Sequence, residues 1–179
     1  AIQYNKEKDY LEASFKNAKF WSNANHWDWA VNPNPREKAS FLKENILPLQ
    51  ESGQLNLIDL PQNGAIIENS PLGFDILFVD GHTEKQMLPI ITYKGKKIVY
   101  IADLIPTVGH IPLIYVIGFD TRPLITVEEK GTFLQKAVEN DYILFFEHDH
   151  VNELATLKLT EKGVRLDQTY SFSEIFDSI

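Results

Sequence analysis

The sequence predicts an α/β fold, and two kinds of pattern indicate it. Three short apolar runs have the composition of buried strands, and each leads directly into histidine or acidic residues. The runs are GFDILFVD at 73–80, KKIVYIAD at 96–103 and YILFF at 142–146. Between the second and third runs, TVEEKGTFLQKAVEND at 126–141 carries apolar residues at helical spacing. A sheet interrupted by helices is the architecture that this order of elements predicts.

The N-terminal third of the chain predicts two short strands and one helix. The strand candidates are AKFWSN at 18–23 and LNLIDL at 55–60. The stretch NHWDWAV, after the first of them, predicts a turn or a short helix. Asn34 precedes Pro35 and is followed by Glu37, which is the pattern of an N-cap, a proline in the first turn and an acidic third position. We therefore expect a helix from Pro35 to about Pro48.

The second apolar run is predicted to form the later strand of a hairpin. The two strands are MLPIITY and KKIVYIAD. Lys94-Gly95 between them supplies a tight two-residue turn. A turn centred there places Asp103 across from about Gln86, which is within roughly 13 Å of extended chain from His82. We therefore expect the ends of these strands to be neighbours.

The remaining elements are a helix and a C-terminal hairpin. Thr126 and Glu129 have the separation of a capping box, so the predicted helix begins at Thr126. ATLKLT, a Lys162-Gly163 turn and VRLDQTYSF predict the hairpin. Because no repeat, linker or low-complexity segment interrupts the chain, we expect residues 1–179 to form a single domain.

Composition excludes several classes of function. The net charge is −8, and no cluster of Lys and Arg provides the basic surface that binding to nucleic acid requires. No apolar stretch approaches the length of a membrane span, and the N-terminus has no signal-peptide pattern, so we expect a cytoplasmic protein without a membrane segment. The absence of a Gly-x-Ser-x-Gly sequence argues against a serine hydrolase of the Ser/His/Asp type.

The chain contains no cysteine, which leaves His, Asp and Glu as its strong metal ligands. Such ligands need rigid supports, and the ends of strands provide them. A carboxylate such as Asp103 can bridge two metal ions, and a pair of ions can hold a hydroxide for attack at a carbonyl or phosphoryl centre. The polar ends of the three apolar runs are therefore a candidate metal site.

The same residues resemble a known family. Gly81-His82-Thr83 after a strand, a hairpin leading to Ile101-Ala102-Asp103-Leu104, and a core strand ending at Glu147-His148-Asp149 resemble the second half of the metallo-β-lactamase superfamily. Residues 15–30 and 41–59 are also similar to the segment that links the two halves in lactonase-like members. The resemblance implies the C-terminal portion of an αββα sandwich.

The resemblance also implies a set of ligands and a reaction. It makes His82 a ligand of a first metal ion, Asp103 a bridge between two ions and His148 a ligand of the second. The ions are divalent, with zinc as the default and manganese or iron as alternatives. The implied activity is that of a hydrolase whose metal-bridged hydroxide attacks a lactone or another ester-like bond of a small-molecule substrate.

The family's His-x-His-x-Asp-His sequence, which supplies most of both metal shells, does not occur in this chain. We therefore expect the chain to be the C-terminal part of a longer domain, with the missing ligands in an N-terminal part of the same protein. The sequence identifies no catalytic acid or base and no oligomeric state. His110 and His150 could contact substrate or orient a ligand, and each could equally be structural. The alternative function is a non-catalytic binding or scaffolding domain that keeps the fold without a complete metal site.

Overall fold

The computed structural model describes residues 1–176, and the chain forms two compact units. The first unit comprises Ala1–Gln62, and the second begins at Asn63. Each unit is described by itself below. That the whole chain belongs to one domain stays a prediction.

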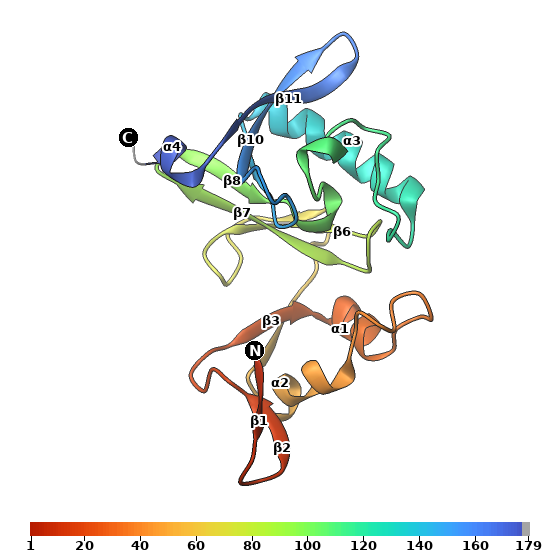
Figure 1. Cartoon of the computed structure of the whole chain (residues 1–179), viewed down its shortest axis with the longest axis vertical. Coiled ribbons are helices and arrows are strands. Elements are labelled where there is room, and N and C mark those ends of the chain that lie inside the picture. Colours follow the sequence, from red (N-terminus) through yellow and green to blue (C-terminus); the bar gives the residue numbers. More distant parts are fainter. Residues whose placement is uncertain (177–179) are drawn as a thin grey trace. The chain divides into compact units, whose positions relative to one another are not determined.

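The first unit contains two small sheets and two short α-helices (Figure 1). Strands β1 and β2 pair antiparallel, while β3 and β4 pair parallel. The bounds are β1 Ile2–Asn5, β2 Tyr10–Ala13, β3 Phe20–Asn23, α1 Ala24–Val31, α2 Leu47–Glu51 and β4 Leu55–Ile58. The strands predicted at 18–23 and 55–60 are confirmed, and NHWDWAV is helical. The β1–β2 hairpin was not predicted, because its residues are mostly polar.

The prediction of a continuous helix from Pro35 to Pro48 is wrong. Asn34 Oδ1 does accept hydrogen bonds from the backbone N–H groups of Arg36 and Glu37, at 2.9 and 3.1 Å. The side chain of Glu37, however, is buried and accepts a hydrogen bond from Trp29 Nε1 at 2.7 Å. The cap therefore starts only a series of turns, followed by the 3₁₀ helix η1 (Lys43–Asn45) and then α2. Glu37 thus binds Trp29 of α1 as well as Asn34, at 2.7 and 2.6 Å.

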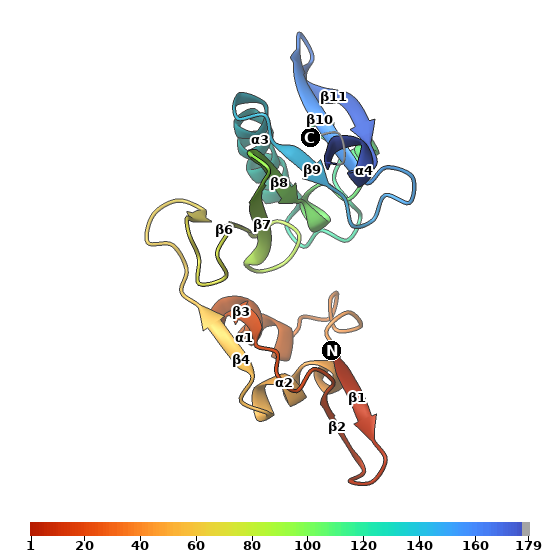
Figure 2. The same cartoon turned by 90° about the vertical axis from the view of Figure 1, so that its left-hand side faces the viewer.

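The second unit is built on a seven-stranded sheet with the order β11-β10-β9-β8-β7-β6-β5 (Figures 1 and 2). Strands β8 and β9 pair parallel, and every other neighbouring pair is antiparallel. The strands are β5 Ile66–Ile67, β6 Asp75–Val79, β7 Gln86–Tyr93, β8 Lys96–Tyr100, β9 Ile143–Phe145, β10 Leu154–Thr160 and β11 Gly163–Tyr170. The helices are η2 Ala102–Leu104, η3 Val108–His110, α3 Pro123–Glu139 and α4 Phe172–Phe176. All three apolar runs are thus strands of one sheet.

Buried side chains join the sheet to its helices. Phe133, Leu134 and Ala137 of α3 belong to one apolar cluster with residues of the central strands, such as Val99 and Leu144, which are 0 % exposed. A smaller cluster joins α4 to strands β8, β9 and β10. This packing makes the central strands rigid supports for the residues at their ends.

The β7–β8 hairpin has the predicted turn. Lys94 and Gly95 both have positive φ, at 46° and 76°, as a type I′ turn requires. The C-terminal hairpin of β10 and β11 is confirmed as well.

The capping box predicted at Thr126 is wrong, because α3 begins earlier, at Pro123. Proline is favoured in the first turn, where its missing N–H costs nothing. Thr126 lies inside the helix, and its side chain is almost fully buried. Glu129 instead accepts hydrogen bonds from the backbone N–H groups of Asp80 and Gly81, at 2.7 and 3.0 Å. Among residues 1–176, no helix is long and apolar enough to cross a membrane.

Candidate metal centre

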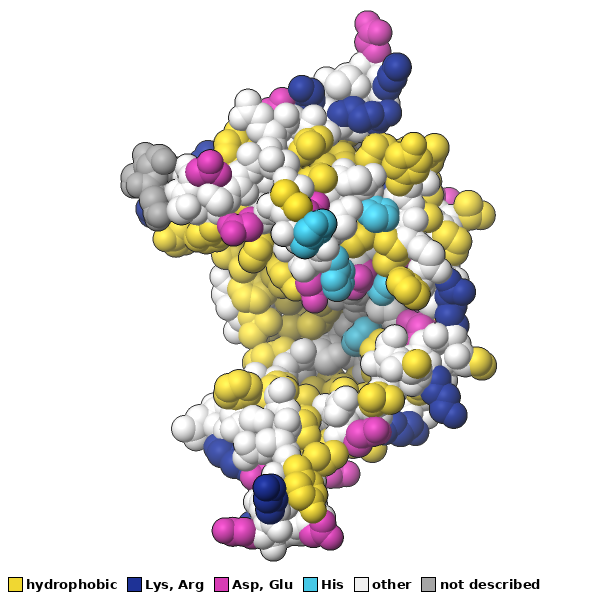
Figure 3. All heavy atoms as spheres, viewed as in Figure 1, with side chains coloured by type: hydrophobic (Ala, Val, Ile, Leu, Met, Phe, Trp, Pro, Cys, Tyr) yellow, Lys and Arg dark blue, Asp and Glu magenta, His cyan; other side chains and the backbone are white. Residues whose placement is uncertain are grey.

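Asp103 lies between two imidazoles. Its Oδ2 atom is 3.6 Å from His82 Nε2, and its Oδ1 atom is 3.2 Å from His148 Nε2. The three residues come from separate elements: the loop after β6, η2 after β8, and the loop after β9. Figure 3 shows imidazole and acidic side chains side by side on this face of the second unit. The structure thus brings His82, Asp103 and His148 together, with one carboxylate oxygen facing each imidazole.

Backbone geometry directs Asp103 out of the sheet. Ala102 has a φ of 42°, in the left-handed region that residues with a Cβ rarely adopt, and it is buried. The chain therefore turns sharply after β8. Gln86 Nε2 donates a hydrogen bond to Asp103 Oδ2 at 3.0 Å, which confirms the predicted placement of Asp103 across from Gln86. Gln86 consequently holds Oδ2, while Oδ1 faces His148.

The loop that carries His82 is held by residues before and within α3. Thr121 N donates to His82 O at 3.1 Å, and Arg122 N donates to Gly81 O at 2.9 Å. Arg122 Nη1 donates to Asp80 O at 2.7 Å. Burial raises the pKa of the Glu129 carboxyl, while the hydrogen bonds from the backbone N–H groups of Asp80 and Gly81 act in the opposite direction. The backbone of the loop is therefore held from Asp80 to His82.

Asp120 and Arg122 are two residues apart in the sequence and have opposite charges, but the structure gives each of them a different partner. Asp120 Oδ1 is 3.0 Å from His82 Nδ1, and Arg122 Nη2 is 2.7 Å from Glu84 Oε2. Asp120 is therefore a contact of a candidate ligand that the sequence did not reveal. Spacing alone could not have found it, because the loop after β6 and the start of α3 meet only through the tertiary fold.

Glu147 is a second acidic residue at the cluster. Asp103, Glu147 and His148 each offer a ligand atom within 4.8 Å of the others. Burial raises the pKa of the Tyr100 hydroxyl to about 12, with further contributions from a hydrogen bond to Glu147 and from the charges of Glu147 and Asp103. Tyr100 therefore keeps its proton at neutral pH and holds Glu147 beside the cluster.

The other histidines have different surroundings. His110 Nδ1 lies 2.8 Å from Thr107 Oγ1, and burial, followed by the charge of Lys130, lowers the pKa of the His110 imidazole. Lys130 is fully buried, and its ammonium donates hydrogen bonds to the backbone oxygens of His110, Pro112 and Tyr115, at 3.0, 3.1 and 2.5 Å. The side chain of His150 is exposed. Roles in substrate contact or ligand orientation stay predictions for His110 and His150.

The donor atoms suit divalent ions. Imidazole nitrogens and carboxylate oxygens are ordinary ligands of zinc, manganese and iron. Asp103 presents one oxygen toward each imidazole, which is the arrangement that a carboxylate shared between two ions needs. The residues present therefore fit a metal centre with Asp103 in the middle.

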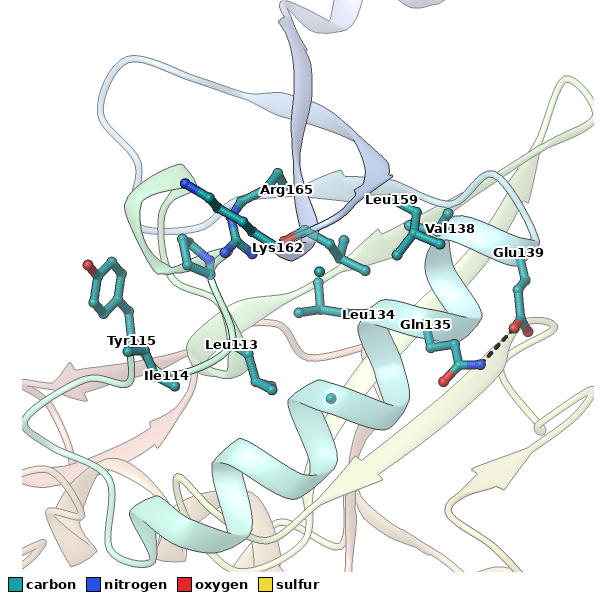
Figure 4. Close-up of a pocket in the computed structure, with 14 residues that line it drawn as sticks. Leu113, Ile114, Tyr115, Leu134, Gln135, Val138, Glu139, Leu159, Lys162 and Arg165 are labelled. Atoms are coloured by element: carbon teal, nitrogen blue, oxygen red, sulfur yellow. Dashed lines mark hydrogen bonds between the residues drawn. The ribbon is translucent and has the colours of Figure 1, made fainter.

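A separate groove of about 700 Å³ lies between α3 and the β10–β11 hairpin (Figure 4). Leu134 and Leu159 contribute to its apolar wall, and Arg165 lies at its rim. Gln135 Nε2 donates a hydrogen bond to Glu139 Oε1 at 3.0 Å on the side of α3. The lining includes none of His82, Asp103 and His148, so the groove and the candidate metal centre are different features.

Comparisons with known proteins identify the fold. No family model matches the chain, and no curated protein matches it. A probable metal-dependent hydrolase from Staphylococcus aureus is 21% identical, with a TM-score of 0.68 over 89% of this chain and 56% of that chain. The hydrolase AbOPH of the β-lactamase superfamily is 18% identical, with a TM-score of 0.68 over 89% of this chain and 57% of that chain.

A third solved structure is AidC, a dizinc quorum-quenching lactonase in complex with a product, N-hexanoyl-L-homoserine. It is 20% identical to this chain, with a TM-score of 0.63 over 87% of this chain and 56% of that chain. The chain thus spans a little over half the length of these structures. The predicted resemblance is confirmed at the level of the fold: the chain has the α/β fold of metal-dependent hydrolases of the β-lactamase superfamily.

Proposed function

We propose that this chain is part of a metal-dependent hydrolase in which His82 binds one divalent ion, His148 binds a second and Asp103 bridges them. The observation that carries the proposal is the position of the Asp103 carboxylate, whose Oδ2 and Oδ1 atoms lie 3.6 and 3.2 Å from the two imidazoles. Likeness of fold to metal-dependent hydrolases supports the same reaction class. Zinc is the proposed metal, with manganese or iron as alternatives.

The residues of the chain would hold and orient the reacting groups. When bound, two such ions supply Lewis acidity and a nucleophilic water at neutral pH. Gln86 would keep Oδ2 of Asp103 in place through its hydrogen bond at 3.0 Å. Tyr100, whose pKa is raised to about 12, would remain a hydrogen-bond donor to Glu147 throughout the neutral range.

Three ligands are too few for two ions, since even one structural zinc ion usually has four. We therefore propose that a further segment, carrying the His-x-His-x-Asp-His sequence, completes the centre from an N-terminal part of the same protein. The intact mass of the native protein tests this point directly. A mass well above the 20.5 kDa of this chain is expected.

The proposed substrate is a small molecule with a lactone or another ester-like bond. Two observations support it: the lactonase AidC shares the fold, and the donor set is suited to polarising a carbonyl oxygen. The alternative, a non-catalytic binding or scaffolding domain, requires no convergence of imidazoles on a carboxylate. The observed cluster therefore favours the hydrolase.

Metal analysis of purified variants tests the proposal. We expect His82→Ala and Asp103→Ala to lower the bound metal per chain and to abolish hydrolysis of a γ-lactone and of an aryl ester, followed by proton release. Asp167→Asn is the matched control, because this carboxylate on β11 pairs with Lys158 on β10 at 3.3 Å and neither residue is a candidate ligand. Full metal content and activity in both site variants would contradict the proposal.

A further inference from the structure

We propose that Asp120 is a positioning residue that fixes the tautomer and the orientation of the His82 imidazole, so that Nε2 faces Asp103. The inference rests on the proposed function, because it assigns Asp120 a role only through His82. It adds a residue that is not itself a ligand and that the sequence pattern did not reveal.

The two ring nitrogens of His82 face two different carboxylates. Nδ1 lies 3.0 Å from Asp120 Oδ1, and Nε2 lies 3.6 Å from Asp103 Oδ2. A neutral imidazole carries one proton, and the nitrogen with the shorter contact to a carboxylate is the better place for it. With the proton on Nδ1 donated to Asp120, the lone pair of Nε2 points to the cluster. That is the form of histidine that a metal ion binds.

Asp120 is built into the fold. Its side chain is 1 % exposed, and its backbone N–H donates to Ile117 O at 3.2 Å. The next two residues bind the histidine loop, since Thr121 Oγ1 donates to His82 O at 3.0 Å and Arg122 N donates to Gly81 O at 2.9 Å. The backbones of the two segments are therefore joined beside the side-chain contact, which leaves the carboxylate little freedom to move away.

The buried carboxylate has few neutralising contacts. Its Oδ2 atom is buried, and no hydrogen-bond partner for that atom is found in the described part of the chain. A buried carboxylate without full hydrogen bonding costs stability. Its charge also raises the pKa of the buried Lys130 ammonium, against the larger lowering by burial, so the two charges interact inside the unit. A neutral side chain would cost less to bury at this position. The negative charge is instead used in the contact with the His82 imidazole.

The geometry of the pair matches a known physical effect. A carboxylate that accepts the second N–H of a metal-binding histidine fixes the ring and makes the other nitrogen more basic. Loss of such a partner commonly weakens metal binding about 10- to 100-fold. Asp120→Asn keeps the size of the side chain but removes its charge, so it should affect the histidine more than the packing.

Zinc affinity and the protonation of the ring are the measurements. We expect Asp120→Asn to weaken zinc binding to the full protein about 10- to 100-fold in competition with a chelating dye. Asp167→Asn removes an exposed carboxylate of the same unit and should leave zinc binding unchanged. Thermal unfolding of the metal-free proteins shows whether Asp120→Asn is folded.

Nitrogen NMR of His82 in the metal-free wild-type protein shows which ring nitrogen carries the proton. This measurement does not depend on the folding of a variant. We expect the neutral ring to carry its proton on Nδ1. A proton on Nε2 overturns the proposal, as does wild-type zinc affinity in folded Asp120→Asn when His82→Ala has lost binding. If His82→Ala itself binds zinc like the wild type, the proposed metal centre fails, and the positioning role fails with it.

Discussion

At Gly81, the addition of a single methyl group should displace the loop that carries His82. A Cβ atom added there would lie 2.3 Å from Thr126 Oγ1, 2.4 Å from Thr126 N and 2.6 Å from Thr126 Cα. Two of these atoms belong to the backbone of α3, so a change of rotamer cannot relieve the overlap. Gly81→Ala must therefore push the His82 loop away from the helix by roughly 1 Å, to reach ordinary non-bonded separations of about 3.5 Å.

Such a shift would break contacts as well as packing. Glu129 accepts hydrogen bonds from the backbone N–H groups of Asp80 and Gly81, at 2.7 and 3.0 Å, and Arg122 N donates to Gly81 O at 2.9 Å. Overpacking costs about 1–3 kcal/mol, and a lost hydrogen bond to a charged group costs about 1.5–3 kcal/mol. Because the loop can relax partly, we expect the free energy of unfolding to fall by about 3 kcal/mol.

Urea unfolding of Gly81→Ala and of a control measures this effect. Gly118→Ala is the control, because a Cβ at Gly118 would have nothing within 4 Å. We also expect zinc binding to weaken in Gly81→Ala, since His82 moves with the loop. A change in unfolding free energy within about 0.5 kcal/mol of the control would refute the reasoning, because a surface substitution produces that much.

Three further predictions concern the same unit. Burial lowers the pKa of Lys130 to about 8, so the unfolded state binds more protons than the folded state between about pH 8 and the ordinary value of 10.5. The free energy of unfolding of the wild type, relative to that of Lys130→Met, should therefore rise with pH across this window, as measured by urea titrations. Gly95 has a φ of +76° in the β7–β8 turn, so Gly95→Ala should cost about 1 kcal/mol in thermal unfolding, and no loss would contradict the strain. Tyr100→Phe removes the hydroxyl that donates a hydrogen bond to Glu147, so the free energy of unfolding measured in urea should fall by about 1.5 kcal/mol; an unchanged value would show that the bond contributes nothing.

Local patterns predicted the parts of the fold that local physics decides. The strands before His82, Asp103 and His148 were recognisable because buried strands are uninterrupted apolar runs. The turn at Lys94-Gly95 fixed the register of β7 against β8. That register placed Asp103 near Gln86, and the structure contains the hydrogen bond that the placement implies. The approach of His148 to Asp103 also requires the parallel pairing of β8 with β9, which no turn in the sequence specifies.

The errors occurred where a side chain had a distant partner. Asn34 and Glu37 have the sequence of a helix start, but Glu37 is bound by Trp29. Thr126 and Glu129 have the sequence of a capping box, but the carboxylate of Glu129 binds the backbone of the loop after β6. In each case the acidic residue that the local pattern assigns to the helix N-terminus also bonds to a group outside the predicted helix.

Asp120 illustrates the same limit at the site itself. Beside Arg122 it has the appearance of half of a local ion pair, the usual outcome for neighbouring opposite charges. In the structure, Arg122 instead pairs with Glu84, and Asp120 contacts His82. The buried carboxylate of Asp120 is therefore directed at an imidazole. A buried charge costs stability unless it is paired and hydrogen-bonded. The contact of Asp120 with His82, in place of one with the nearby Arg122, is therefore better explained by the orientation of the His82 imidazole than by stability alone.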